Sequence, residues 1–292
     1  MPRLPPALRS NILLVWLIAP TVTGVLLSLL TLMPSLFSLF GLVTDHCTIH
    51  DGHLHLCLTH PPLPVDNSVF QFALITLLGI TTVFMIISLF NLLRAYKLQQ
   101  FLMMASQPHE VHDIRVVDWD MPLALSAGIW RKQVFISSQL IQTLSKQQLE
   151  VVIKHEQTHL RRSDPLRHFV AHTFSFTHIP RLRKYLLADL ELAAEQACDE
   201  AAAQTRGRLH VADTILAVER LFVMKRPPNM LMSISGSNIT ARVEALLAQP
   251  TVHVSLPGAY MALIGAGALF VALAMMDDIH HFTESILQLI TG

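Results

Sequence analysis

Three long apolar runs interrupt the alternation of hydrophobic and polar residues along this chain. They cover residues 12–43, 69–93 and 256–276, and none of them contains Lys, Arg, Asp or Glu. An uncharged apolar stretch of roughly 18 residues or more is typical of a helix that crosses a membrane. The pattern therefore predicts about three transmembrane helices.

The first run is long enough for more than one arrangement. One long helix with a kink near Pro20 or Pro34 is favoured, because two helices within residues 12–43 would each be too short to cross. A helical hairpin that enters and leaves the same face is the alternative. No small-residue cleavage site follows the run, so we expect an uncleaved anchor rather than a signal peptide.

Basic residues predict the orientation of these helices. Arg3 and Arg9 precede the first run, Arg94 and Lys97 follow the second, and residues 44–68 contain neither Lys nor Arg. The positive-inside rule then places the N-terminus in the cytoplasm. The predicted order is a tail and membrane helix at 1–43, an external loop at 44–68, a second helix at 69–93, a cytoplasmic domain at 94–255, a third helix at 256–276 and an external amphipathic tail at 277–292.

The overall composition agrees with a membrane protein. Charged residues make up 14% of the chain and hydrophobic residues 52%, which favours membrane insertion over a soluble fold. The formal net charge is zero, and no Gly-rich phosphate loop or basic patch occurs. Nucleic acid is therefore not expected as a partner, whereas membrane lipids are.

Helical periodicity predominates in the predicted cytoplasmic domain. Strand signals occur at residues 112–117 and 133–137, so the chain as a whole is expected to be mainly α, with an α+β domain that contains a small sheet. An edge strand of that sheet could bind an extended substrate by backbone pairing. Helices are expected at residues 145–162, 181–204, 211–224 and 239–247.

The first of these helices carries the most informative motif, H-E-x-x-H, at residues 155–159. Residues i and i+4 of a helix lie on one face, so the imidazoles of His155 and His159 could bind a single Zn²⁺. Glu156 would then lie beside the metal without having to bind it. A carboxylate in that position is the general base of a metallopeptidase.

Clear start and stop signals bound this helix. Ser145 is a good N-cap, and Gln148 occupies the matching position of a capping box. Ser163 and Asp164 precede Pro165, which favours the first position of a new helix. The motif is therefore expected in the middle of a well-defined helix.

A catalytic zinc usually has three protein ligands and one open position, so a third ligand is needed. Glu195 is the best candidate, because it lies in an Ala- and Leu-rich helix and shares a face with Asp199, four residues further on. Asp199 would accept the second ring N–H of a ligand histidine. Glu191, in the same helix, is the alternative third ligand.

Other polar residues suggest weaker hypotheses. His172, in an apolar stretch between the two ligand helices, is a candidate for stabilising an oxyanion, although a core or interfacial histidine is the simpler interpretation. Cys47 and Cys57 fall in the external loop, where an oxidising space permits a disulfide. The same loop is rich in histidine, so metal or pH sensing and a merely disulfide-closed polar loop are both open.

In its motifs the chain resembles the BlaR/MecR-type antirepressor family of integral membrane zinc metallopeptidases. The likeness covers residues 126–203, and it rests on a glycine-then-strand segment at 127–137, the extended H-E-x-x-H segment at 155–165 and an E-x-A-C-D segment at 195–199. The resemblance implies a zincin-like fold with one Zn²⁺ per chain. It also implies the individual roles: His155, His159 and Glu195 as ligands, Glu156 as base, and Asp199 as the partner of a ligand histidine.

The resemblance further implies regulated proteolysis at the bacterial inner membrane. The expected substrate is a cytoplasmic protein such as a BlaI-type transcriptional repressor, or the chain itself. The resistance sensors of the family carry a penicillin-binding domain after their last span, whereas only a short tail follows residue 276 here. Direct β-lactam sensing is therefore not expected.

Two other functions are kept as alternatives. A membrane quality-control protease resembling HtpX would use the same zinc chemistry, but such chains place membrane spans between the motif helix and the third ligand, and the segment from His159 to Glu195 is too short for that. A non-enzymatic receptor that senses metal or another signal would not need the intact residue set. The pattern gives no indication of the oligomeric state.

Overall fold

The computed structural model describes residues 4–41, 68–109, 113–129, 131–225 and 235–248, together with scattered residues between 267 and 286. Several features predicted from the sequence fall outside these residues. They are the external loop with Cys47 and Cys57, most of the third membrane helix and most of the C-terminal tail.

Two long helices pass the length and composition criteria for membrane spans. Helix α1 comprises Pro6–Leu39 and helix α2 comprises Ser68–Met104, with candidate spans at Pro6–Leu30 and Gly79–Met104. Helix α1 is continuous through Pro20 and Pro34, so the hairpin alternative is not observed.

Helix α2 continues past Leu93, where the sequence pattern predicted its end. Residues 94–104 contain no Pro or Gly and are rich in good helix formers, so nothing in them stops the helix. Near its end Leu102 is 3% exposed and packs against Val117 and Phe135 of the sheet.

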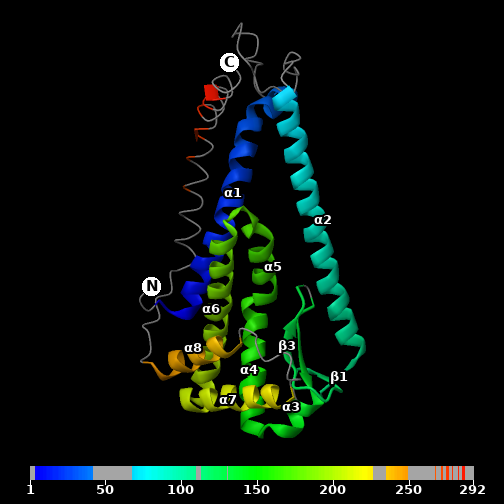
Figure 1. Cartoon of the computed structure of the whole chain (residues 1–292), viewed down its shortest axis with the longest axis vertical. Helices are drawn as coiled ribbons and strands as arrows, with labels where there is room; N and C mark the ends of the chain where they lie inside the picture. Colours follow the sequence, from blue (N-terminus) through cyan, green and yellow to red (C-terminus); the bar gives the residue numbers. More distant parts are fainter. Residues whose placement is uncertain are drawn as a thin grey trace. The chain divides into compact units, whose positions relative to one another are not determined.

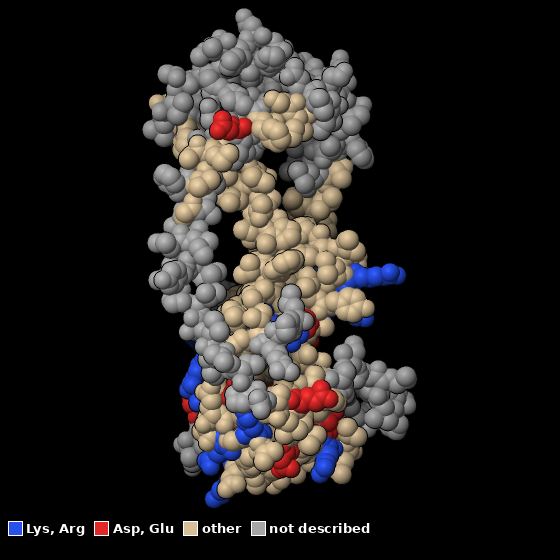
Figure 2. All heavy atoms as spheres, turned by 90° about the vertical axis from the view of Figure 1, so that its left-hand side faces the viewer, with Lys and Arg blue, Asp and Glu red and all other residues tan. Residues whose placement is uncertain are grey.

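The chain divides into two compact units. One contains Met1–Ile18 and Met85–Val254, and the other contains Ala19–Phe84 and Ser255–Gly292. The first unit, called the main unit below, therefore includes the first turns of α1 and the last turns of α2. Figure 2 shows that Lys, Arg, Asp and Glu side chains gather on the part of this unit that carries helices α7 (Arg208–Lys225) and α8 (Ser235–Leu247).

A small mixed sheet lies at one side of the main unit. Its strands are β1 (Ser106–Pro108), β2 (Arg115–Val117), β3 (Ala124–Ala127) and β4 (Gln133–Ser137), in the order β1-β2-β4-β3. The β1–β2 and β3–β4 pairs are antiparallel, and the β2–β4 pair is parallel. The predicted strands match β2 and β4, whereas β1 and β3 were not foreseen because such short segments show no clear alternation.

Helices follow the sheet almost without interruption. The helix of the H-E-x-x-H motif, α4, lies between the sheet and α6 (Figure 1). The helices predicted from periodicity are all present, and α7 and α8 start a few residues earlier than expected. The helical elements are α3 (Ser138–Thr143), α4 (Lys146–Arg162), α5 (Asp164–Phe174), a short 3₁₀ turn (Ser175–Thr177), α6 (Pro180–Arg206), α7 (Arg208–Lys225) and α8 (Ser235–Leu247).

Helix α4 starts with the capping box expected from the sequence. The amide of Gln148 donates to Ser145 Oγ over 3.2 Å, and the amide of Ser145 donates to Gln148 Oε1 over 3.1 Å. These bonds satisfy two of the amides that a helix start leaves unpaired. The first turn of the motif helix is thus fixed by local interactions.

Helix α4 is packed on two sides. Val152 and Ile153 join a buried cluster with Val134 and Ile136 of the sheet. On another face Val151 packs in a second cluster with residues of α6, α7 and α8, namely Ala202, Ala203, Val211, Ala212 and Leu246. Burial on both sides leaves α4 little freedom to shift or rotate, because packed cores do not deform gradually.

Two glycines with positive φ lie at turns of this unit, and the space around them differs. Gly128 (φ 108°) follows β3, and an added Cβ there would overlap the backbone carbonyl of Arg131. Gly207 (φ 84°) ends α6 and has open space around the same position.

Gly207→Ala should lower the free energy of unfolding by about 1 kcal/mol from backbone strain alone, and Gly128→Ala should lower it by about 2–4 kcal/mol from strain plus the clash. The thermal unfolding midpoints in detergent measure the difference, and equal midpoints would contradict the tight β3–β4 turn.

Candidate metal centre

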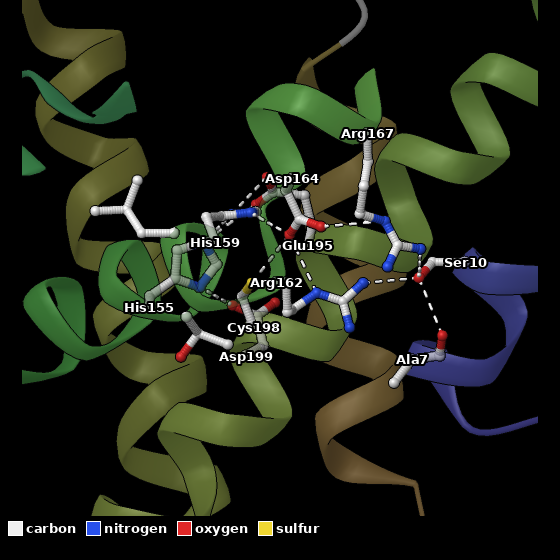
Figure 3. Close-up of polar contacts among 12 residues, drawn as sticks. Ala7, Ser10, His155, His159, Arg162, Asp164, Arg167, Glu195, Cys198 and Asp199 are labelled. Atoms are coloured by element: carbon white, nitrogen blue, oxygen red, sulfur yellow. Dashed lines mark hydrogen bonds and ion pairs between the residues drawn. The ribbon is translucent and has the colours of Figure 1, made fainter. Parts of the chain in front are cut away.

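Three side chains from two helices converge at one point of the main unit (Figure 3). His155 and His159 come from successive turns of α4, and Glu195 comes from α6. The two Nε2 atoms are 3.1 Å apart. Glu195 Oε2 lies 3.4 Å from His155 Nε2, and Glu195 Oε1 lies 3.3 Å from His159 Nε2.

These separations fit one tetrahedral ion. Zn²⁺ binds imidazole nitrogen and carboxylate oxygen at roughly 2.0–2.2 Å, so two ligands of a tetrahedral site are about 3.3–3.6 Å apart. The observed distances of 3.1–3.4 Å are close to that edge length. Three protein ligands leave the fourth corner open, which is the arrangement of a catalytic site rather than of a structural one.

Each of the two imidazoles is oriented by its own buried carboxylate. His155 Nδ1 lies 2.9 Å from Asp199 Oδ1, and His159 Nδ1 lies 2.8 Å from Asp164 Oδ2. Both aspartate side chains are almost fully buried. An ionised carboxylate can only accept, so each Nδ1–H donates to its aspartate and each Nε2 atom faces the centre.

The backbone at the end of α4 explains how Asp164 reaches His159. Ser163 adopts the left-handed conformation (φ 58°), and its amide caps α4 by donating to the carbonyls of His159 and Leu160. The chain then reverses into α5, which brings Asp164 back beside the imidazole. This role of Asp164 was not predicted from the sequence, although the Ser163-Asp164-Pro165 helix break was a signal of this turn.

An arginine on α8 joins the two carboxylates of α6. Arg242 donates from Nε and Nη2 to the two oxygens of Asp199, each over 2.7 Å. Its Nη1 lies 2.8 Å from Glu195 Oε2. A bidentate guanidinium fixes the plane of a carboxylate, so Arg242 orients Asp199 and holds Glu195 near the histidines. Sequence spacing gave no signal for this contact, because it depends on how α8 folds back onto α6.

Burial and neighbouring charges shift the pKa values of His155, His159 and Glu195 in opposite directions. Burial lowers the pKa of His155, but Asp199 and Glu195 raise it to about 9. Burial likewise lowers the pKa of His159, yet Asp164 and its other neighbours raise it to about 12. Burial alone would raise the pKa of Glu195, but the two imidazoles and Arg242 hold it well below its usual value. The carboxylates therefore favour positive charge at this point, which a divalent cation supplies in place of protons.

A second set of potential ligands shares His159. Asp164 and Cys198 lie on its other side, and all three residues are buried. Arg162 and Arg167 both approach Asp164, at 3.1 and 3.7 Å, and their charge would oppose a cation there. Burial also raises the pKa of the Cys198 thiol, which disfavours the thiolate that metal binding needs. The set formed by His155, His159 and Glu195 is thus the better metal site.

The centre opens into a cavity of about 500 Å³. Glu156 and His155 line it, and so does Ala124 of the edge strand β3. Glu191, the alternative third ligand, also lines the cavity, but the carboxylate near both imidazoles is that of Glu195. His172 on α5 is not among the lining residues, and its role in oxyanion binding stays a prediction. Half of the apolar lining residues come from α7, namely Val211, Ile215, Val218 and Phe222.

Comparison with known proteins identifies a family model that matches much of the chain. The family is described as BlaR1 peptidase M56, and its model matches residues 67–246. No curated protein and no solved structure matches the chain. The matched residues include β1–β4, α4 and α6, and hence the complete centre.

The orienting carboxylates should control metal affinity. Asp164→Asn or Asp199→Asn would leave an imidazole without its anionic acceptor, so zinc affinity should fall about 10- to 100-fold. Competition with a chromophoric chelator measures the affinity of the purified proteins. Asp118→Asn is the control, since that carboxylate accepts from Ser138 away from the centre. Unchanged zinc affinity in both variants would contradict the orienting role.

Zinc affinity should also depend on pH. The raised pKa of His155, about 9, means that the metal-free protein keeps this imidazole protonated at neutral pH. Zinc must then displace that proton, so its affinity should rise about tenfold per pH unit for each proton released, and level off for His155 above pH 9. Chelator competition between pH 6.5 and 8.5 measures the slope. An affinity independent of pH would contradict the protonated metal-free site.

Proposed function

The chain belongs to the BlaR1 peptidase M56 family, and from this premise we propose that it is a zinc-dependent endopeptidase of the membrane. The observation that carries the proposal is the convergence of His155, His159 and Glu195 at distances that suit one tetrahedral ion. The cavity beside these residues supplies space for a peptide at the open corner. A peptidase acts on proteins, so a protein substrate is implied.

The chemistry is divided between the metal and the protein. When bound, Zn²⁺ would polarise the scissile carbonyl and lower the pKa of water. Glu156 accepts a proton from the attacking water and later delivers it to the leaving amine. Asp164 and Asp199 keep each imidazole in the tautomer whose Nε2 atom can bind the metal. Arg242 holds Asp199 and Glu195 in place.

The edge strand β3 supports binding of an extended substrate. It is the outer strand on the side of the sheet that packs against α4, and its Ala124 lines the cavity. A substrate segment paired with its free edge would lie next to Glu156 and the metal ligands. The apolar wall from α7 suits a bulky hydrophobic side chain near the scissile bond. We therefore expect cleavage of unfolded or extended segments beside such residues.

The attachment of α1 and α2 supports the membrane arrangement expected from the basic residues. The first turns of α1 and the last turns of α2 both belong to the main unit. Two membrane helices joined by an external loop would place these two ends on the same side. With Arg3, Arg9, Arg94 and Lys97 at those ends, the positive-inside rule favours a cytoplasmic location for the main unit of a multi-pass inner-membrane protein.

The family also suggests a role in signalling. A cytoplasmic regulator such as a BlaI-type repressor, or the chain itself, is the proposed substrate. The family match and the intact set of ligands and base favour this function over that of a non-enzymatic receptor.

The role of Glu156 is tested by Glu156→Gln, which removes the base and leaves all three ligands. Zinc content should stay at about one ion per chain, while cleavage of an unfolded protein such as casein should fall by at least about 100-fold. Glu191→Gln is the matched control, because that carboxylate lines the same cavity but does not neighbour a ligand on α4. N-terminal proteomics of cells that carry the active enzyme or the Glu156→Gln variant would then reveal natural substrates. Normal turnover by the variant would refute the assignment of the base.

A further inference from the structure

One polar residue at the start of α1 is buried in the main unit. Ser10 precedes the apolar run, and its side chain is completely buried. It lies beside Arg162 of α4 and Arg167 of α5 (Figure 3). A buried hydroxyl needs hydrogen-bond partners, and those of Ser10 link it to the metal centre.

Ser10 is the shared acceptor of two arginines. Arg162 Nη2 donates to its Oγ over 2.7 Å, and Arg167 Nη2 donates to the same atom over 3.1 Å. The hydroxyl itself donates to the carbonyl of Ala7 over 3.0 Å, within the same helix. With its donor and both lone pairs used, the hydroxyl has one preferred orientation.

The same two arginines hold Asp164. Arg162 Nε lies 3.1 Å from Asp164 Oδ2, and Arg167 Nε lies 3.7 Å from Asp164 Oδ1. Two guanidinium groups on neighbouring helices repel each other, so they stay together only because a carboxylate and a hydroxyl lie between them. Ser10 thus helps to fix the position of both groups around Asp164.

Asp164 passes this constraint to a metal ligand. Its Oδ2 atom accepts from Arg162 and also contacts His159 Nδ1 over 2.8 Å. The hydrogen bonds form a continuous chain from Ser10 through Arg162 and Asp164 to His159. It crosses three helices, α1, α4 and α5, and it connects a candidate membrane helix to the centre.

Further contacts fix the register of α1. Arg9 forms an ion pair with Asp189 of α6, and Asn11 Oδ1 accepts from Arg167 over 2.7 Å. Apolar residues continue the same face, since Leu13 and Leu17 are buried in a cluster with Ala171, Leu190 and Ala193. One helical turn from Ser10 the chain has Pro6 and Leu14. A shift of α1 by a turn would therefore leave the two arginines without a hydroxyl acceptor.

We propose that Ser10 and Arg162 are positioning residues of the metal centre, so that the placement of α1 sets the orientation of His159. The proposal rests on the proposed function, because it concerns the zinc site. Its consequence is that a displacement or rotation of the first candidate membrane helix changes metal retention and activity. The membrane part of the protein can then control the enzyme without touching the substrate cavity.

Zinc release from the purified full-length protein tests this link without an activity assay. Arg162→Gln should raise the rate at which a chromophoric chelator removes zinc by about tenfold, since it removes the partner of Asp164. Ser10→Ala should raise it about threefold, because Arg162 loses the hydrogen bond that holds it beside Asp164. Ser10→Thr, which keeps the hydroxyl, should release zinc as slowly as the wild type. Val15→Ala is the matched control, because Val15 lies on the same helix with half of its surface exposed.

A double-mutant cycle separates this role from a general loosening of the fold. If Ser10 acts through Arg162, the variant with both Ser10→Ala and Arg162→Gln should release zinc no faster than Arg162→Gln alone. Independent additive effects, or a Ser10→Ala protein that releases zinc like the wild type, would overturn the proposal. A wild-type protein that never binds zinc would overturn the proposed function instead.

Discussion

The pairing of two imidazoles with two buried carboxylates is the interaction on which the site depends. His155 is held by Asp199, and His159 is held by Asp164. A buried carboxylate is costly unless a positive charge and hydrogen bonds compensate for it. Here Arg242 compensates Asp199, and Arg162 with Arg167 compensates Asp164. Two histidine–carboxylate–arginine groups thus connect α4, α5, α6 and α8 around one point.

This polar arrangement needs a rigid base, which the packing of α4 provides. Val152 and Ile153 bind the helix to the sheet, and Val151 binds it to the helical layer formed by α6, α7 and α8. Side chains one turn apart on such a helix keep their spacing, so the two Nε2 atoms stay within reach of one ion. Burial of apolar residues around α4 offsets the free-energy cost of bringing these charged groups together. His155 and Glu195 both line the cavity, so the site can be reached from it.

Local signals in the sequence were sufficient to predict helix α4 and the position of its two histidines on one face. The capping box at Ser145, the break before Pro165 and the i, i+4 spacing of His155 and His159 all depend on a few neighbouring residues. Glu195 followed from helix spacing together with the family likeness. The contacts of Asp164, Arg242 and Ser10 could not be predicted in this way. Asp164 depends on a left-handed turn at Ser163, and the other two depend on helices distant in sequence that pack onto the ligand helices. Strands β1 and β3 were missed because they are too short to show a period.

Metal analysis of the purified full-length protein tests the three-ligand site most directly. Elemental analysis should find about one zinc per chain in the wild type and almost none after Glu195→Ala, since two imidazoles alone hold the ion weakly. Glu191→Ala should keep the wild-type content, because Glu191 lines the cavity without approaching the imidazoles as Glu195 does. A wild-type protein without zinc, or a Glu195→Ala protein that keeps its full complement, would contradict the site described above.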